Sequence, residues 1–307
     1  MRRGLLLGCG GTVGGAWQIG ALAAIERALD WDPRTAEVIV GTSAGATAAA
    51  MLGAGVPVGE LVAAQRGSAD ARDSVRRFCT APPSPVPAVP FGAPSLRLSL
   101  SGVRERHVLP ALAGLLPAGR TDPGFLDDLV DDLVPRGEWA PRPGIWVVGT
   151  SLVTGQRARF GAPGAPRASL RDAVRASWAI PGWYPPVVID GEPFVDGGVR
   201  STASADAVAG LGLDEAIVVV PMASGARVPG VGGLVEGLMR RAMTGVLDAE
   251  LAALEAAGTR VILVQPGAAE LAAMGPNFMD PRRRTAALDV AIGHVGRRLG
   301  GRNATRP

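Results

Sequence analysis

The hydrophobic and polar positions of residues 4–52 follow a strand–loop–helix pattern that occurs twice. Short apolar or β-branched runs predict buried strands, and longer stretches with apolar residues at helical spacing predict helices. Segments rich in glycine and other small residues join each strand to its helix. This order indicates an α/β protein. The expected strands are 4–8 and 37–40, the joining segments 8–15 and 41–45, and the helices 16–29 and 46–52.

The same alternation returns in the second half of the chain. One pair of strands is expected to turn at Thr154-Gly155, and a second hairpin at Asp190-Gly191. Two β-branched runs closer to the C-terminus predict buried parallel strands. The expected strands are 145–148, 156–160, 186–189, 193–195, 216–221 and 260–265, and the expected helices are 247–257 and 282–299.

The segment between these two parts has a different pattern. Residues 81–94 include six prolines, which excludes regular structure there. Residues 96–116 are apolar with interspersed arginines, and 123–134 has one apolar face, so both indicate helices. We therefore predict one domain over residues 1–307 with a mostly helical, proline-rich insertion at about 56–143. The insertion forms either a lid or a fixed helical layer over the core.

Composition narrows the class of protein. The chain has 307 residues, 47% of them hydrophobic and 19% charged, which is typical of a globular protein. No uncharged apolar run approaches the roughly 18–20 residues that span a bilayer. All 31 basic residues are arginine, which excludes lysine Schiff-base chemistry, a Walker A lysine and a Ser–Lys dyad. The arginines and the net charge of +3 fit either an anionic partner or a coding preference for arginine over lysine. The arginines are scattered along the chain, which argues against a nucleic-acid partner.

Cysteine and histidine are too sparse for a metal site. The chain has two of each, which predicts no zinc site and no disulfide framework, and hence a reducing, cytoplasmic compartment. Leu6-Leu7-Gly8-Cys9 looks like a lipoprotein cleavage site. The apolar stretch before it is shorter than the roughly 7–15 residues of a signal core, so we expect no processing.

Gly41-Thr42-Ser43-Ala44-Gly45 matches the G-x-S-x-G pattern between an expected strand and an expected helix. A nucleophile elbow needs small residues around its serine because the turn is tight. Gly41 and Gly45 meet this need, and the turn would place the Ser43 hydroxyl at a helix N-terminus. The alternative is an ordinary small-residue turn.

The glycine-dense segment 8–15 admits two interpretations. A dinucleotide fingerprint starting at Gly8 requires glycine at the position of Val13, so that pattern fails. The other is an oxyanion hole, because glycines at a helix N-terminus present free backbone N–H groups. Parallel strands would bring this loop beside the elbow at the carboxyl edge of the sheet.

A nucleophilic serine needs a base. The order Ser43, Asp196, His294 would match an α/β-hydrolase triad, but that fold needs several strands before its elbow. His294 also lies in an apolar helical pattern, and His107 lies in a charged segment. Asp196 ends a strand and precedes two glycines, whereas Asp190 is the expected turn residue. Asp196 is therefore the better candidate.

Four segments resemble the patatin-like phospholipase family, in the order that the family has them. They are Gly8–Leu22, the Gly41–Gly45 elbow, the A-S-x-A-x-P match at Ala176–Pro181 and Asp196-Gly197-Gly198, and Gly149–Phe160 is also similar. The resemblance implies a three-layer α/β/α sandwich with a mostly parallel sheet. It also implies a Ser43–Asp196 dyad without histidine, and an oxyanion hole at Gly10, Gly11 and Thr12. The family usually has Arg or Lys where this chain has Val13.

These observations predict a serine acyl-ester hydrolase that acts on lipids, without metal or organic cofactor. The rivals are a carboxylesterase or thioesterase with the same dyad and a catalytically inactive lipid-binding protein. Residues 96–116 and 231–246, the latter with Arg240-Arg241, are candidates for peripheral contact with a membrane surface, or else helices of the core.

Overall fold

A computed structural model describes residues 1–80, 95–104, 108–224 and 233–303. Its centre is one eight-stranded sheet in the order β5-β6-β3-β2-β1-β7-β8, with β4 beside β3. The pairs β3–β2, β2–β1, β1–β7 and β7–β8 are parallel, and the pairs that include β4, β5 or β6 are antiparallel. The strands are β1 (Arg3–Leu7), β2 (Val38–Thr42), β3 (Ile145–Ser151), β4 (Arg157–Phe160), β5 (Val187–Ile189), β6 (Glu192–Asp196), β7 (Glu215–Val219) and β8 (Arg260–Val264).

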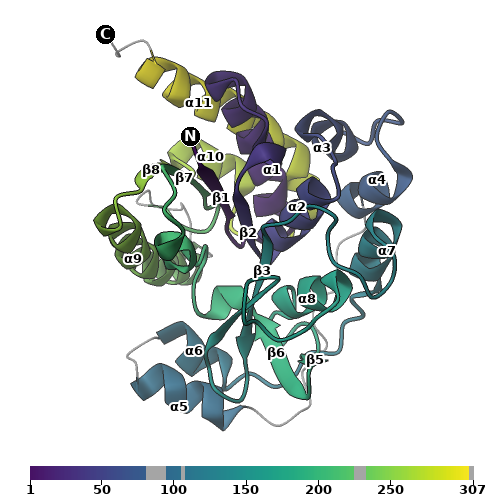
Figure 1. Cartoon of the computed structure of the whole chain (residues 1–307), viewed down its shortest axis with the longest axis vertical. Helices are drawn as coiled ribbons and strands as arrows, with labels where there is room; N and C mark the ends of the chain where they lie inside the picture. Colours follow the sequence, from purple (N-terminus) through teal and green to yellow (C-terminus); the bar gives the residue numbers. More distant parts are fainter. Residues whose placement is uncertain (81–94, 105–107, 225–232, 304–307) are drawn as a thin grey trace.

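Helices cover both faces of this sheet. In Figure 1, α9 lies on one side of the strands and α1 and α2 lie on the other. The α-helices are α1 (Gly11–Leu29), α2 (Ala44–Gly53), α3 (Val58–Gln65), α4 (Asp73–Thr80), α5 (Leu96–Arg104), α6 (Val108–Ala113), α7 (Gly124–Leu133), α8 (Leu170–Ser177), α9 (Gly233–Ala256), α10 (Ala268–Met274) and α11 (Arg284–Asn303). The 3₁₀ helices are η1 (Pro33–Thr35), η2 (Gly197–Val199), η3 (Ala205–Leu211) and η4 (Pro281–Arg283).

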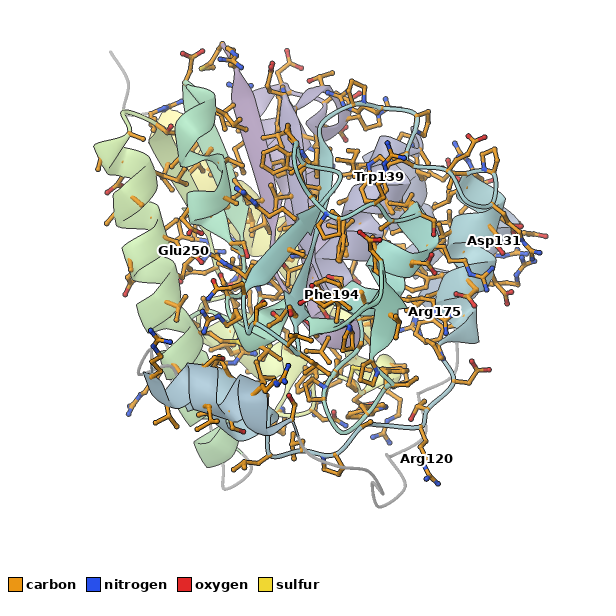
Figure 2. The ribbon with its side chains drawn as sticks, turned by 60° about the horizontal axis from the view of Figure 1, so that its bottom comes forward. Arg120, Asp131, Trp139, Arg175, Phe194 and Glu250 are labelled. Atoms are coloured by element: carbon orange, nitrogen blue, oxygen red, sulfur yellow. The ribbon has the colours of Figure 1, made fainter. Side chains whose placement is uncertain are left out.

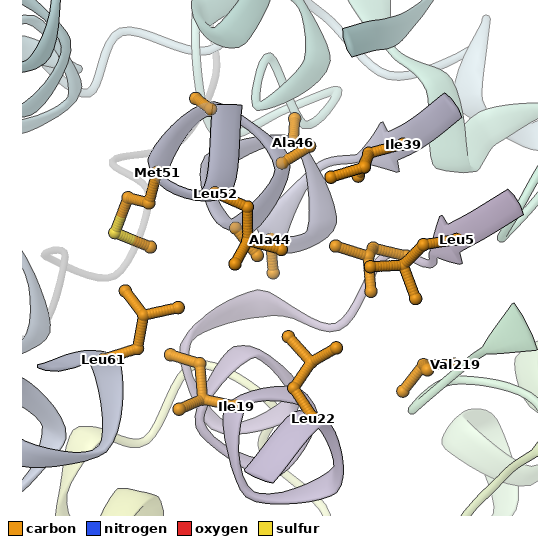
Figure 3. Packing of buried hydrophobic residues seen from close by; sticks show 14 of the residues in the cluster. Leu5, Ile19, Leu22, Ile39, Ala44, Ala46, Met51, Leu52, Leu61 and Val219 are labelled. Carbon is orange, nitrogen blue, oxygen red and sulfur yellow. The ribbon is translucent and has the colours of Figure 1, made fainter. Parts of the chain in front are cut away.

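The alternation of side chains along the strands produces two cores. Leu5 and Leu7 of β1 pack with the larger cluster, which contains α1, α2 and α11, whereas Leu6 packs with the cluster under α9 and η3. Figure 3 shows the larger cluster, where Leu22 of α1 and Leu52 of α2 meet between the helices and the sheet. Because helices cover both faces, the parallel strands are mainly apolar, with charged or hydroxyl residues only at their ends. The expected three-layer α/β/α fold with a mostly parallel sheet is confirmed.

Both predicted hairpins are present, with turns of the expected kind. β3 pairs antiparallel with β4 beyond Gly155, and β5 pairs with β6 across Asp190-Gly191. Asp190 and Gly191 have φ values of 52° and 79°, the left-handed conformation that such two-residue turns require. Asp190 is thus an exposed turn residue, as the sequence indicated.

Two helices begin more than two residues before the start that the sequence predicted. Residues 11–15 were expected in a loop but form the first turn of α1, because Gly11 adopts φ 58° and the glycines after it continue as helix. α9 begins at Gly233, well before the expected start at 247. Glycine weakens a helix only by about 1 kcal/mol, which tertiary packing outweighs at both positions.

The segment between α2 and β3 divides into two parts. Helices α3, α4 and α7 contribute Leu61, Val75 and Leu129 to the larger core, so they form part of the helical layer. Helices α5 and α6 pack on each other at one end of the molecule (Figure 1). The proline-rich stretch 81–94 lies outside the described residues. The single-domain organisation and the lid stay predictions.

None of the described helices combines the length and the apolar character that crossing a membrane requires.

Candidate active site

Ser43 occupies the junction between β2 and α2 in a strained conformation. Its φ of 56° and ψ of −119° are unusual for a residue with a side chain, and such a conformation costs about 1–3 kcal/mol. The elbow leaves no room beside it: a Cβ on Gly45 would lie 2.0 Å from the Leu7 carbonyl oxygen, and one on Gly41 would lie 2.4 Å from the Gly45 carbonyl oxygen. The small residues of G-x-S-x-G are therefore required by the close approach of α2 to the end of β1.

A second serine holds the elbow in place. The Ser43 backbone N–H donates to Oγ of Ser177 at 2.8 Å, and the Ser177 hydroxyl donates to the Val148 carbonyl at 2.6 Å. Ser177 is fully buried at the end of α8. It belongs to the A-S-x-A-x-P segment, so the sequence marked the position without indicating what its hydroxyl does.

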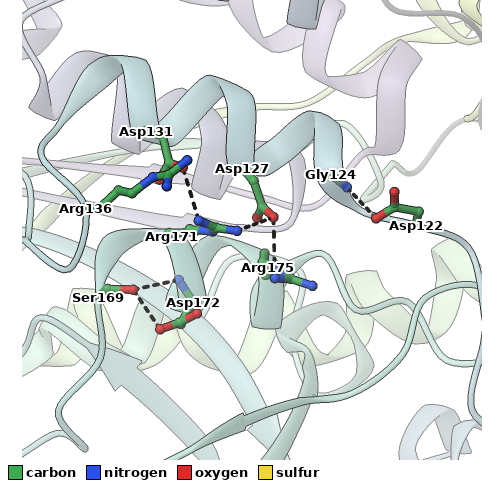
Figure 4. Close-up of polar contacts among 9 residues, drawn as sticks. All are labelled: Asp122, Gly124, Asp127, Asp131, Arg136, Ser169, Arg171, Asp172 and Arg175. Atoms are coloured by element: carbon green, nitrogen blue, oxygen red, sulfur yellow. Dashed lines mark hydrogen bonds and ion pairs between the residues drawn. The ribbon is translucent and has the colours of Figure 1, made fainter.

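Ion pairs on the outside of the protein position α8. Arg171 donates to Asp127 of α7 at 2.6 Å and to Asp131 at 3.1 Å, and Arg175 lies 3.5 Å from Asp127 (Figure 4). Ser169 caps the helix by accepting from the Asp172 N–H. In Figure 2, Asp131 and Arg175 lie on the opposite side of the protein from Glu250 of α9. The network fixes α8 against α7, and so orients Ser177 under the elbow.

Sheet register brings Asp196 to Ser43. Thr42 of β2 is paired with Val148 of β3, and the next residue of β3, Gly149, is paired with Asp196 of β6. Ser43 and Asp196 therefore face each other across β3. Asp196 is 4% exposed and Ser43 2% exposed. The Asp196 carboxylate accepts from the Gly198 N–H at 2.7 Å and from the Ser43 hydroxyl.

Burial gives this carboxyl group an unusual pKa. Loss of solvent around Asp196 raises its pKa from 3.8 to about 7, against the opposing effect of the hydrogen bonds from Gly198 and Ser43. A carboxylate in water is too weak a base to activate a serine, but one with a pKa near neutrality is matched to proton transfer at physiological pH. Asp196 is thus in contact with Ser43 and suited to accept its proton.

The glycine loop lies beside the elbow, as the parallel pairing of β1 with β2 requires. An added Cβ on Gly15 would lie 3.4 Å from Cβ of Ala44. In the described chain, the backbone N–H groups of Gly10, Gly11 and Thr12 have no hydrogen-bond acceptor, whereas Val13 donates to the Phe278 carbonyl at 2.9 Å. Gly10 and Gly11 line the cavity at Ser43, and Thr12 lies one residue further into α1.

A cavity of about 240 Å³ opens over these residues. Apart from Ser43 and Asp196 its walls are mainly apolar. They come from distant parts of the chain: Ala113 at the end of α6 and Leu116 after it, Ile180, Pro181 and Val199, and Met222, Met243 and Phe278. The last three lie in the C-terminal third, where the sequence showed no motif. Their apolar character was visible, but only the fold places them at Ser43.

Cys9 also lines the cavity but is unsuited to be a nucleophile. Burial and the nearby Asp196 carboxylate raise the pKa of its thiol to about 12. Its Sγ lies 3.2 Å from Oγ1 of Thr202, and its N–H donates to the Thr202 carbonyl at 2.9 Å. Cys9 therefore stays protonated and helps to anchor the start of the glycine loop.

The structure separates His294 from the serine. His294 lies on α11 with Nδ1 4.0 Å from a Glu270 carboxylate oxygen, and it does not line the cavity. His107 falls outside the described residues. Among the residues that the structure describes, no cluster of three or more His, Cys, Asp or Glu side chains has the arrangement of a metal site.

Comparison with a family model supports the family resemblance that the four sequence segments indicated. The family model for patatin-like phospholipase matches residues 5–209, which is more than half of the chain. The crystal structure of VipD from Legionella pneumophila is similar with 15% sequence identity and a TM-score of 0.46, over 98% of this chain and 67% of that chain. No curated protein sequence matches the chain. By its extensive match to the family model, the chain belongs to the patatin-like phospholipase family, a family of lipid hydrolases.

Proposed function

We propose that this protein is a serine hydrolase that cleaves acyl esters of lipids with Ser43 as nucleophile and Asp196 as base. The observation that carries the proposal is the strained Ser43, whose hydroxyl donates to a buried carboxylate with a pKa of about 7. The family supports a lipid ester as substrate, and the apolar cavity at Ser43 fits an acyl chain.

The reaction proceeds in two halves. Ser43 Oγ attacks the ester carbonyl carbon while its proton passes to Asp196, and the carbonyl oxygen becomes an oxyanion. The N–H groups of Gly10 and Gly11, with Thr12 behind them, would donate to that oxyanion, and each such donor contributes about 2.7–4 kcal/mol. Asp196 then protonates the leaving alcohol as its bond to carbon breaks. In the second half, water gives a proton to Asp196 and attacks the acyl carbon. Asp196 then returns this proton to Ser43 Oγ as the bond between Oγ and the acyl carbon breaks, which releases the fatty acid and restores both residues.

Substrate profiling tests this function. The purified protein should release fatty acid from phospholipids or lysophospholipids with a higher kcat/KM than from p-nitrophenyl acetate or a short acyl thioester. A profile that favours short, water-soluble esters or thioesters would instead support the carboxylesterase or thioesterase alternative. Failure of folded protein to react with a fluorophosphonate probe would indicate a lipid-binding protein without activity.

We also propose that the α5–α6 region contacts the membrane that holds the substrate. Four large apolar side chains there are strongly exposed: Leu100 and Val103 at 67%, Leu115 at 56% and Leu116 at 49%. Arg97, Arg104 and Arg120 are exposed in the same segment, and Arg120 extends away from the protein body in Figure 2. Leu116 also lines the cavity at Ser43, so this surface borders the entrance. Exposed apolar and arginine side chains together fit an anionic bilayer.

Vesicle sedimentation tests the contact. Each arginine near an anionic surface contributes about 1 kcal/mol, so we expect R97Q/R104Q to weaken binding to phosphatidylglycerol vesicles by about tenfold or more at low salt. Hydrolysis of a dissolved short ester should not change. R297Q, on α11 at the opposite end of the molecule (Figure 1), removes a charge away from this surface and is the control. Equal weakening by R297Q, or no weakening by R97Q/R104Q, would contradict the assignment.

A further inference from the structure

A second, smaller cavity adjoins the one at Ser43. Its volume is about 70 Å³, and Leu152, Tyr184 and Val195 contribute to its walls. Ala113, Leu116 and Pro181 line both cavities, so the two spaces share one wall. The second cavity lies on the other side of this wall, next to the β5–β6 hairpin, to which Val195 belongs.

The lining of the second cavity is suited to hydrocarbon. Its residues are mainly leucine, valine, alanine and proline. The Ser95 hydroxyl at its edge donates to the Leu152 carbonyl at 3.2 Å and accepts from the Leu98 N–H at 3.3 Å, so its polar atom has partners within the protein. Among the described residues that line it there is no arginine and no carboxylate. A phosphate or glycerol headgroup would find no charged partner there, whereas a methylene chain would lose only contact with water.

Leu116 lies between the two cavities, and the rest of the protein encloses its side chain only in part. It is 49% exposed, and a Cβ on Gly182 would lie 3.8 Å from Leu116 Cβ and Cδ1, which is ordinary van der Waals contact. About half of its surface is exposed, so shortening its side chain should cost less stability than truncation of a fully buried leucine. Its neighbour Leu115 is exposed to a similar degree and lines neither cavity.

We propose that the acyl chain attached to Ser43 passes Leu116 into this second cavity, and that Leu116 and the size of the cavity set the preferred chain length. The proposal rests on the hydrolase function proposed above and adds a specificity-determining residue to it. The carbonyl end of the chain lies in the larger cavity, and the methyl end lies among Leu152, Tyr184 and Val195.

Hydrolysis of p-nitrophenyl esters with 4 to 16 acyl carbons, below their micelle concentrations, tests the proposal. L116A should widen the passage and raise kcat/KM for long chains, by about fourfold for each further methylene that becomes buried. L152F fills the cavity and should shorten the preferred chain, so that kcat/KM falls more for long acyl chains than for the butyrate. A118L narrows the same cavity from another wall and should act in the same direction, which covers failure of L152F to fold. L115A is the matched control: Leu115 belongs only to the proposed membrane surface, which dissolved esters do not need, so this variant should keep the wild-type chain-length profile.

The double variant L116A/L152F separates the effect of Leu116 on entry of the acyl chain from the effect of the second cavity's size. If the long-chain gain of L116A depends on the second cavity, L152F should remove it. An unchanged chain-length profile in both L152F and A118L, in folded protein, would overturn the proposal, as would an equal shift in L115A.

A binding measurement keeps this proposal separate from the hydrolase function. S43A should bind free fatty acids, and the dependence of its Kd on chain length should shift in S43A/L116A and S43A/L152F as the kinetic profile does. If no ester is cleaved but these shifts occur, the cavity assignment stands and the proposed activity fails. If hydrolysis depends on Ser43 but neither profile shifts, the activity stands and the cavity assignment fails.

Discussion

Replacement of Ser43 by alanine is expected to lower kcat for p-nitrophenyl butyrate by about 10⁴- to 10⁶-fold, because no other group can form the acyl-enzyme. Asp196→Asn should lower kcat by a similar order, since an amide cannot accept the Ser43 proton. The double variant should be no slower than the slower single variant, because a nucleophile and its base act as one unit. Steady-state kinetics on purified protein provide the measurement.

The controls for this prediction are variants of the two other residues that the sequence offered as candidates for the base. His294→Ala and Asp190→Asn should keep near wild-type kcat, because His294 lies by Glu270 on α11 and Asp190 is an exposed turn residue. Circular dichroism and the melting temperature should show that each variant is folded. Loss of activity in folded His294→Ala would replace the dyad with a histidine triad.

The second large effect is a pH dependence set by one carboxyl group. Asp196 accepts a proton only when it is ionised, and burial raises its pKa to about 7. Below that pH, kcat/KM should therefore fall about tenfold for each unit, and above it the rate should reach a plateau. A rate profile between pH 4.5 and 9 on a neutral ester measures this. A plateau that extends down to pH 5 would show that Asp196 is not the base.

The same pKa has an opposite consequence for stability. Folding raises the pKa of Asp196 from 3.8 to about 7, so between these values the folded state binds a proton that the unfolded state has released. The free energy of unfolding should thus fall as pH rises from about 4 to 7, because in this range the folded state binds more protons than the unfolded state. At pH 8, Asp196→Asn should be more stable than the wild type, by roughly 1–4 kcal/mol, because the buried charge is gone. Urea unfolding at pH 4 and pH 8 measures both changes.

Local pattern was sufficient for the strands, for the strand–helix alternation around Ser43 and for the choice of candidate site residues. The strand–helix alternation, the small residues around Ser43, and the turn at Asp190-Gly191 each depend on neighbours within a few positions, which a periodicity or a tight turn reveals. The predicted starts of two helices were wrong, since glycines give their first residues a low intrinsic helix propensity. α1 begins at Gly11 and α9 begins at Gly233, inside such segments.

By itself, the sequence determined the α/β class, and it predicted the elbow at Ser43 and Asp196, rather than Asp190, as the candidate base. Only the tertiary structure decided that Ser177 holds the elbow, that Met222, Met243 and Phe278 complete the cavity, and that Leu116 stands between two cavities. These residues meet through sheet register and helix packing between segments far apart in the chain. No periodicity within a segment carries that information, because a contact between distant residues depends on how every element between them is placed.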